Sequence, residues 1–155
     1  MDKQKIYDLA MLDVAKRISE LSKDPSSKIG SVITGNDNQI ISQGFNGFPR
    51  NVADKPERYN EREVKYKFIV HAEANAIYNA LKNGASLDGS TIYINGLPCC
   101  SECAKAIIQT GIKRVVMRCD LTTEESKRWL VPFEFTKVML HEADINYEFI
   151  DLRGE

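Results

Sequence analysis

Apolar and polar positions along the first half of the chain follow two different periods. Residues 6–21 carry apolar side chains three or four positions apart, which predicts an amphipathic helix. The β-branched runs at 29–34 and 40–45 predict a strand pair, because the intervening residues 35–38, Gly-Asn-Asp-Asn, are typical of a turn. Residues 46–67 are polar and charged and contain two prolines, so they predict a loop with at most one helical turn.

The second half alternates predicted strands and helices. Helices are expected over 72–81, which is rich in alanine, and over 104–109; strands are expected at 91–95, 114–117 and 146–150. Another helix falls within 123–142, strongest at 135–143, where Pro132 marks a kink or a late start. The element order αββαβαβαβ predicts a five-stranded α/β sandwich whose site-building loops lie at the C-terminal ends of strands.

Composition limits the range of functions. The chain has 155 residues, 28% of them charged, and a net charge of −1. We expect a single domain over 1–155 and a small-molecule substrate, since no broad basic field would attract long nucleic acids, and a polynucleotide-editing enzyme is disfavoured. No apolar signal segment opens the sequence and no apolar run is long enough to cross a membrane, so a cytoplasmic location is expected.

Two short motifs carry the candidate chemistry: His71-Ala72-Glu73 and, after a gap, Cys100-Ser101-Glu102-Cys103. The histidine and the two cysteines supply three zinc ligands, and three protein ligands leave one position open, as in catalytic zinc sites. Zinc in that state lowers the pKa of a bound water, and the spare carboxylate of Glu73 can move protons. The pattern matches the H-x-E…C-x-x-C signature of zinc-dependent nucleobase deaminases.

The spacing of both motifs places them at helix N-termini. Cys100 and Cys103 are three residues apart and precede a helix-forming run, where the partial positive charge of a helix end favours a thiolate. His71 and Glu73 would lie about 200° apart around a helix, so both can approach one ion only if it lies off the helix end. We therefore expect two helix N-termini to point at one metal ion.

Other interpretations of these motifs remain open. A C-x-x-C pair also serves as a redox pair or as half of a four-ligand structural zinc site. The other half is missing here, since Cys119 stands alone, and the pair comes too late in the chain for a thioredoxin-like site. Cys99 could compete with Cys100, although it is four residues from Cys103. A zinc-stabilised binding or structural protein is the alternative outside enzymology, but such a site has no use for Glu73.

Four segments carry a resemblance to a known family. They are Ser22–Gly30 (SKDPSSKIG), Gly44–Arg50 (GFNGFPR), His71–Ile77 (HAEANAI) and Cys100–Lys105 (CSECAK). Through them residues 6–150 resemble the deoxycytidylate (dCMP) deaminases of the cytidine deaminase superfamily. The resemblance implies a five-stranded mixed sheet flanked by helices in a three-layer sandwich, one catalytic Zn²⁺ per chain, and homo-oligomers that are commonly hexamers.

The resemblance also implies roles for individual residues. His71, Cys100 and Cys103 would be the zinc ligands, Glu73 the proton shuttle, Asn46 a contact to sugar or base, and the Ala72 backbone a contact to the base edge. The family places a proline directly before its first zinc cysteine, whereas this chain has Pro98-Cys99-Cys100, and the family register favours Cys100. The implied reaction converts dCMP to dUMP with release of ammonia. A free cytosine nucleoside or another amino-substituted base is the alternative substrate.

Weaker signals concern phosphate and regulators. Ser26, Ser27 and Lys28, in a turn before a strand, are candidates to bind a substrate phosphate; Arg50 and Arg118 are weaker ones. Residues 44–47 resemble a motif at which some relatives bind dCTP or dTTP, with which Mg²⁺ would be associated.

Two further expectations concern a second metal and two aromatic residues. The absence of cysteine and histidine between residues 46 and 70 argues against the second, structural zinc of some relatives. Trp129 and Phe133 are expected in the core or in a subunit contact.

Overall fold

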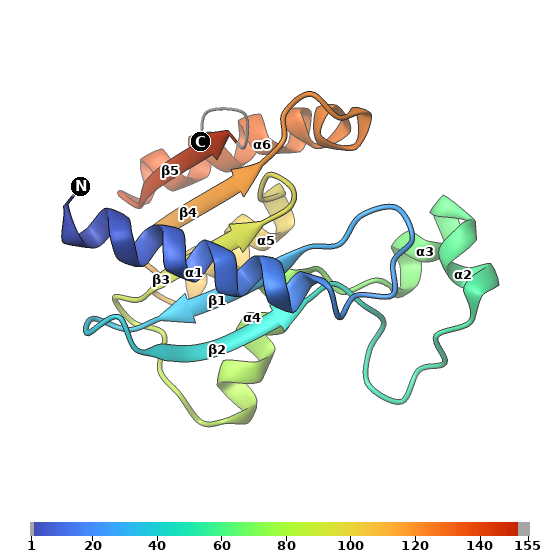
Figure 1. The fold of residues 1–155 in the computed structure, drawn as a ribbon, viewed down its shortest axis with the longest axis horizontal. Helices are drawn as coiled ribbons and strands as arrows, with labels where there is room; N and C mark the ends of the chain where they lie inside the picture. Colours follow the sequence, from blue (N-terminus) through green and yellow to red (C-terminus); the bar gives the residue numbers. More distant parts are fainter. Residues whose placement is uncertain (1, 152–155) are drawn as a thin grey trace.

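A mixed five-stranded sheet organises the computed structural model, which describes residues 2–151 (Figure 1). Its strands are β1 (Gly30–Thr34), β2 (Ile40–Phe45), β3 (Thr91–Asn95), β4 (Arg114–Cys119) and β5 (Asn146–Asp151). The order is β2-β1-β3-β4-β5; β1 runs antiparallel to β2 and β3, whereas β3, β4 and β5 are parallel. The predicted five-stranded mixed sheet is confirmed. The predicted domain, 1–155, extends at both ends beyond the described residues.

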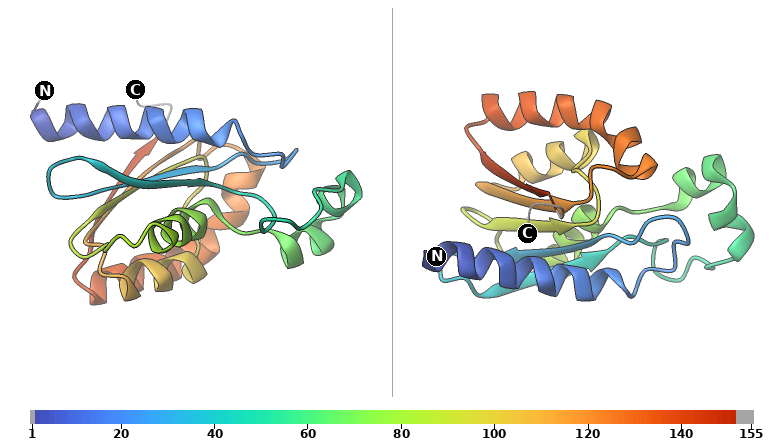
Figure 2. Two further views of the ribbon diagram at one scale, coloured as in Figure 1. Left: turned by 90° about the horizontal axis from the view of Figure 1, so that it is seen from below. Right: turned by 45° about the horizontal axis from the view of Figure 1, so that its top comes forward.

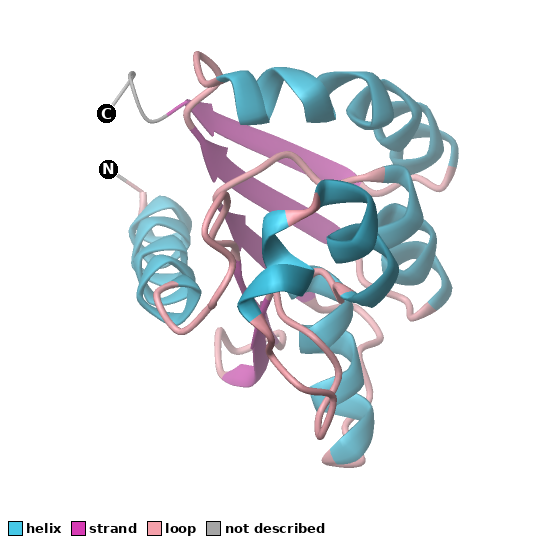
Figure 3. Ribbon diagram, turned by 90° about the vertical axis from the view of Figure 1, so that its right-hand side faces the viewer, coloured by secondary structure: helices cyan, strands magenta, loops and turns pink. Residues whose placement is uncertain are grey.

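Helices cover the two faces of the sheet. The helix α1 (Lys3–Ser19) lies on one face, and α4 (Ala72–Lys82), α5 (Ser101–Gln109) and α6 (Glu124–Glu142) lie on the other (Figures 2 and 3). Side chains alternate along the strands between two buried clusters. On the α1 side the cluster consists of Leu12, Ala15, Val32, Tyr93 and Val116. The strand neighbours Ile33, Ile92, Ile94, Val115 and Met117 face the three helices opposite. The three-layer arrangement follows from this alternation.

The segment predicted as a loop over 46–67 contains two short helices, α2 (Pro56–Asn60) and α3 (Arg62–Phe68). Aromatic contacts hold them: Phe48 stacks on Tyr59 with ring centroids 4.0 Å apart, and it lies 5.4 Å from Phe68. The guanidinium of Arg58 lies 4.5 Å from the Phe68 ring centroid. The expectation of at most one helical turn was wrong, because a few aromatic side chains organise a segment whose composition is otherwise polar.

The helix α6 begins at Glu124 and continues through Pro132, so the late start offered as one explanation of that proline was wrong. Thr123 caps the helix by accepting a hydrogen bond from the Ser126 amide, which fixes the first turn. The other predicted elements are confirmed to within a few residues. Within residues 2–151, no helix combines the length and apolar character needed to cross a bilayer.

Candidate metal centre and its pocket

The N-terminal half of α4 is fastened to the C-terminal end of β2. A Cβ atom on Gly44 would lie 2.4 Å from the Ala76 amide nitrogen, so only glycine permits this approach of strand and helix. The Ser42 hydroxyl donates to the Ala76 carbonyl at 2.8 Å, and the Asn75 amide donates to the Phe45 carbonyl at 2.8 Å. These contacts fix the position of the first turn of α4 relative to the sheet.

His71 is the N-cap residue of α4 and Glu73 lies in its first turn. The preceding residue, Val70, forms a two-way backbone bridge with Gly47, with N···O distances of 2.7 and 3.1 Å. His71 makes no capping hydrogen bond to its own helix, which leaves its ring free to turn toward other groups. Glu73 is 4% exposed. The helix end therefore presents an imidazole and a buried carboxylate together, as the spacing predicted.

The cysteine pair lies at the N-terminus of α5. Cys100 is the N-cap residue, and its sulfur accepts a hydrogen bond from the Cys103 amide at 3.5 Å. The Thr136 hydroxyl of α6 donates to the Cys99 carbonyl at 2.8 Å and so secures the segment that enters the helix. The Cys99 thiol donates to the Cys100 carbonyl at 3.5 Å.

His71, Cys100 and Cys103, the metal cluster, bring three donor atoms within 4.8 Å of one another. The His71 Nδ1 atom lies 3.3 Å from the Cys100 sulfur and 3.5 Å from the Cys103 sulfur. Ligand atoms around tetrahedral zinc, with bonds of about 2.0–2.3 Å, are separated by roughly 3.5 Å. Two sulfurs and one imidazole nitrogen at these separations fit Zn²⁺ with one position left for another ligand. Cys99 is not part of the cluster.

The metal cluster and Glu73 have shifted pKa values. Contact with Cys100 raises the pKa of His71 to about 9, against the effect of burial. Hydrogen bonding from Cys103, followed by contact with His71, lowers the pKa of Cys100 to about 4. Burial raises the pKa of Glu73 to about 7, so this carboxyl group can exchange a proton near neutral pH. A metal ion would displace the imidazole proton on binding.

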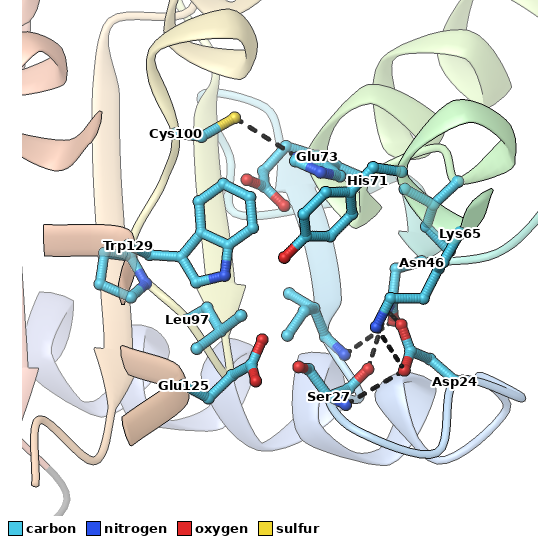
Figure 4. Close-up of a pocket in the computed structure, with 14 residues that line it drawn as sticks. Asp24, Ser27, Asn46, Lys65, His71, Glu73, Leu97, Cys100, Glu125 and Trp129 are labelled. Carbon is cyan, nitrogen blue, oxygen red and sulfur yellow. Dashed lines mark hydrogen bonds and ion pairs between the residues drawn. The ribbon is translucent and has the colours of Figure 1, made fainter. Parts of the chain in front are cut away.

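A pocket opens beside the metal cluster (Figure 4). His71, Glu73 and Cys100 form one end, and Trp129 of α6 lies with its ring 5.6 Å from His71 at an interplanar angle of 88°. The Trp129 Nε1 atom is buried and has no hydrogen-bond partner within the described residues. Burial acts to raise the pKa of the neighbouring Glu125 carboxyl group, but contacts with Ser27, Arg128 and Trp129 lower it below its usual value.

Four residues on the other side of the pocket, Asp24, Ser27, Asn46 and Lys65, form what we call the polar wall. The Asp24 carboxylate accepts from the Lys65 ammonium at 3.3 Å and from the Ser27 amide at 3.3 Å. The Asn46 side chain donates to the Ser27 carbonyl at 2.9 Å and accepts from the Ile29 amide at 2.9 Å. Three segments that are distant in sequence are thereby joined into one surface.

The remaining predicted residues lie in different surroundings. Ser26 and Lys28 are exposed and are not among the residues that line this pocket. Ala72 is fully buried as the first residue of α4. Arg118 is buried, with its guanidinium 2.9 Å from Asn95 Oδ1, and is likewise not part of the lining.

Lys65 and Trp129 are among the pocket residues that sequence reasoning missed, as are Asp24 and Glu125. Trp129 packs against the main core cluster, as expected, but it also lines the pocket. Lys65 falls in a charged run that is typical of a solvated loop. The spacing of Val64 and Phe68 was the available signal, since two apolar residues four apart favour a helical turn with one face inward.

Comparisons with known proteins agree with this geometry. The family model for the cytidine and deoxycytidylate deaminase zinc-binding region matches residues 4–119. An uncharacterized deaminase from the luxG 3′ region of Aliivibrio fischeri is 39% identical over 140 residues, which cover 90% of each chain. The probable deoxycytidylate deaminase of Drosophila melanogaster is 38% identical over 145 residues, 83% of this chain and 70% of that protein.

Two further similarities concern the length of a relative and the fold of a solved structure. The deoxycytidylate deaminase of Mus musculus is 41% identical over 112 residues, which cover 69% of this chain and 61% of the mouse protein. The chain thus spans about three fifths of that relative's length. The structure of dCMP deaminase from the cyanophage S-TIM5 in complex with dCMP and dUMP superimposes with a TM-score of 0.73 at 23% identity, covering 97% of this chain and 99% of that one. This last similarity concerns the fold.

Proposed function

The chain belongs to the cytidine and deoxycytidylate deaminase family, and we propose that it hydrolyses dCMP to dUMP with release of ammonia. One observation carries the proposal: the metal cluster and the buried carboxyl of Glu73 lie at the same end of one pocket. A structural zinc site needs no such carboxyl. The names of the mouse and Drosophila relatives and the dCMP and dUMP bound to the cyanophage enzyme support the choice of substrate.

We assign His71, Cys100 and Cys103 as the residues that hold Zn²⁺. When bound, the metal supplies a water molecule that is acidic enough to act as a nucleophile at neutral pH. The net reaction forms a C4–O bond and breaks the C4–N bond of the cytosine ring. The burial of Cys100 and Cys103 keeps competing water away from their sulfurs.

Glu73 moves the protons in this proposal. Its carboxylate takes a proton from the attacking water and gives it to ring N3, which makes C4 more electrophilic. It then takes the proton of the new C4 hydroxyl group and delivers it to the exocyclic amino group, which leaves as ammonia while the C4 carbonyl forms. A pKa near 7 suits a group that must both accept and donate a proton during one turnover.

Other residues would hold the substrate. The Ala72 backbone, at the start of α4, is proposed to contact the base edge, and Asn46 to contact sugar or base. Trp129 would lie beside the base because its ring lines the pocket next to His71. Ser26 and Lys28 lie outside the pocket lining. They could bind the substrate phosphate only if their turn moved toward the pocket.

Ammonia release tests the reaction. Zinc-loaded protein is incubated separately with dCMP, deoxycytidine, CMP and cytidine, each with and without dCTP and Mg²⁺. We expect selective turnover of dCMP. Turnover of the nucleosides alone would mean that the substrate is a free cytosine nucleoside and not a nucleotide. If none of the four is deaminated although zinc is bound, another amino-substituted base or a non-enzymatic, zinc-stabilised protein takes the place of this proposal.

We also propose regulation by dCTP or dTTP, with Mg²⁺ accompanying the triphosphate. A second cavity of about 430 Å³, large enough for a small ligand, supports this proposal. Gly44, Gly47 and Asn75, which position α4, line it together with Arg50. An occupant would therefore touch the residues that fix His71 and Glu73. A change in dCMP turnover on addition of each nucleotide, lost in Arg50→Ala, is the expected result.

We further propose that residues 1–155 form one cytoplasmic domain that assembles into homo-oligomers, with a hexamer as the expected size. Val131, Phe135 and Val138 support this, since they are 68%, 63% and 54% exposed and lie four and three residues apart along α6. Light scattering should give a mass several times that of the chain, and Phe135→Glu should reduce it. A monodisperse monomer would refute the assembly without affecting the chemistry.

A further inference from the structure

Lys65 is a buried cation in the wall of the pocket. It lies in α3, is 6% exposed, and lines the pocket beside Asn46 and Asp24, across from Trp129 and Glu125 (Figure 4). An ammonium group removed from water is costly unless it is paired or hydrogen-bonded. A buried lysine at this position therefore needs an explanation beyond chain packing.

The ammonium group of Lys65 has more hydrogen-bond donors than its described contacts use. An ammonium group has three donors. Its described contacts are one ion pair with Asp24 Oδ1 at 3.3 Å and the Tyr66 ring, whose centroid lies 5.8 Å from Nζ. The same Asp24 oxygen already accepts from the Ser26 amide at 2.9 Å and from the Ser27 amide at 3.3 Å. Asp24 thus holds the lysine in place while competing groups share its oxygen.

The charges around the pocket make Lys65 the group that an anion would seek. Within the described residues, the lining contains one lysine and no arginine, against three carboxyl groups, Asp24, Glu73 and Glu125. A phosphate monoester carries between one and two negative charges at neutral pH. Entry of that group beside three acids is unfavourable unless a cation binds it directly.

Lys65 lies with Asn46 and Asp24 on the side of the pocket away from Cys100 (Figure 4). The base must reach Glu73 and the metal cluster, so the sugar and phosphate extend toward the polar wall. Lys65 belongs to that wall, next to Asn46, whereas Lys28 is exposed outside the pocket lining.

We propose that Lys65 binds the phosphate of the substrate and makes the pocket selective for a nucleoside monophosphate over the free nucleoside. The inference rests on the proposed function and deepens it. Asp24 is a positioning residue that keeps the ammonium directed along the wall until the phosphate takes over one or two of its donors. The substrate class is therefore set by α3, a segment that lies outside the zinc motifs.

Lys65→Met tests the proposal, with Lys67→Met as the matched control. Lys67 lies in the same helix but is exposed, so the control removes the same charge without touching the pocket. Titration calorimetry compares dUMP with deoxyuridine, and kinetics compares kcat/KM for dCMP and deoxycytidine. In Lys65→Met, the preference for the phosphorylated ligand should fall roughly 10- to 100-fold, the value of a charge-assisted hydrogen bond. Binding of the nucleosides should stay within about twofold, and Lys67→Met should behave as the wild type.

Two further variants guard against a folding defect. Asp24→Asn/Lys65→Met removes both charges together, so no unpaired ion stays buried. The phosphate preference should still be lost in the double variant, and Lys65→Arg should retain most of it. If a folded, zinc-loaded Lys65→Met protein keeps the wild-type preference, or loses affinity for both ligands equally, Lys65 has only a structural role. If the wild-type protein deaminates dCMP in either case, the proposed function survives; if it binds neither ligand, both proposals fall.

Discussion

The metal cluster and the polar wall face the same pocket but are built in different ways. The metal cluster comes from two short motifs, each at the N-terminus of a regular helix that packs on the sheet. The polar wall comes from a turn before β1, the residue after β2, and a short helix in a charged segment. Its cohesion depends on side-chain contacts such as Asp24 with Lys65 and Asn46 with the Ser27 carbonyl.

We infer from this difference that the metal cluster sets the type of reaction and the polar wall sets the choice of substrate. Histidine and cysteine at helix ends can hold a metal whatever substrate enters, so the metal cluster defines the type of reaction. The wall consists of common polar residues whose effect depends on which segments meet there. We therefore expect changes in the metal cluster to abolish turnover, and changes in the wall to alter stability and substrate preference.

The largest effect should come from removing a metal ligand. Cys100→Ala leaves His71 and Cys103, so the protein should lose stoichiometric zinc and essentially all turnover. Cys99→Ala is the matched control, because its thiol lies outside the metal cluster and donates to a backbone carbonyl. Zinc content by elemental analysis should fall in Cys100→Ala alone. Loss of zinc in Cys99→Ala instead would show that Cys99, and not Cys100, is the zinc ligand.

The next largest effect is expected at Glu73. Glu73→Gln keeps the size of the side chain and removes its ability to carry protons, so kcat should fall by roughly 10²- to 10⁴-fold with zinc retained. Elemental analysis and steady-state kinetics on the same preparation check both statements. Substantial turnover by the zinc-loaded variant would mean that another group moves the protons.

A smaller effect on activity, but a clear one on stability, is expected at Asp24. Asp24→Asn leaves the Lys65 ammonium buried without its counter-ion, which typically destabilises a fold by about 3–5 kcal/mol. Denaturant unfolding measures this loss, and the KM for dCMP should rise while zinc content stays unchanged. Asp54→Asn is a suitable control, since its ion pair with Lys23 is largely exposed. Equal losses in the two variants would contradict the distinction between them.

The smallest effect should come from Trp129→Phe. Phenylalanine keeps an aromatic ring beside His71 and removes a buried N–H that has no hydrogen-bond partner within the described residues. Turnover should change by less than about threefold and stability should change little, because this N–H makes no close hydrogen bond that the substitution would remove. A decrease in kcat/KM of more than tenfold would show instead that Trp129 Nε1 donates to the substrate.

Most of the fold and all of the proposed metal ligands could be predicted because their signals are local. Runs of apolar and β-branched residues between turn residues predicted the strands, the apolar stripe predicted α1, and helix-forming runs predicted α4, α5 and the end of α6. The exceptions have two different causes. The helices α2 and α3 depend on contacts of Phe48 with Tyr59 and Phe68, which are distant in sequence. The start of α6 depends on a cap at Thr123 rather than on Pro132.

By itself, the sequence determined the alternating layers and the proposed zinc donors, because residue type and spacing are enough to specify a helix face, a strand face and a set of metal-binding side chains. Tertiary structure decided which polar residues share the pocket with those donors. Lys65 and Asp24 lie 41 positions apart, and their residue types alone do not distinguish them from solvated residues. Only the packing of α3 against the turn before β1 removes both charges from water, and burial is what gives ordinary charged side chains a specific role.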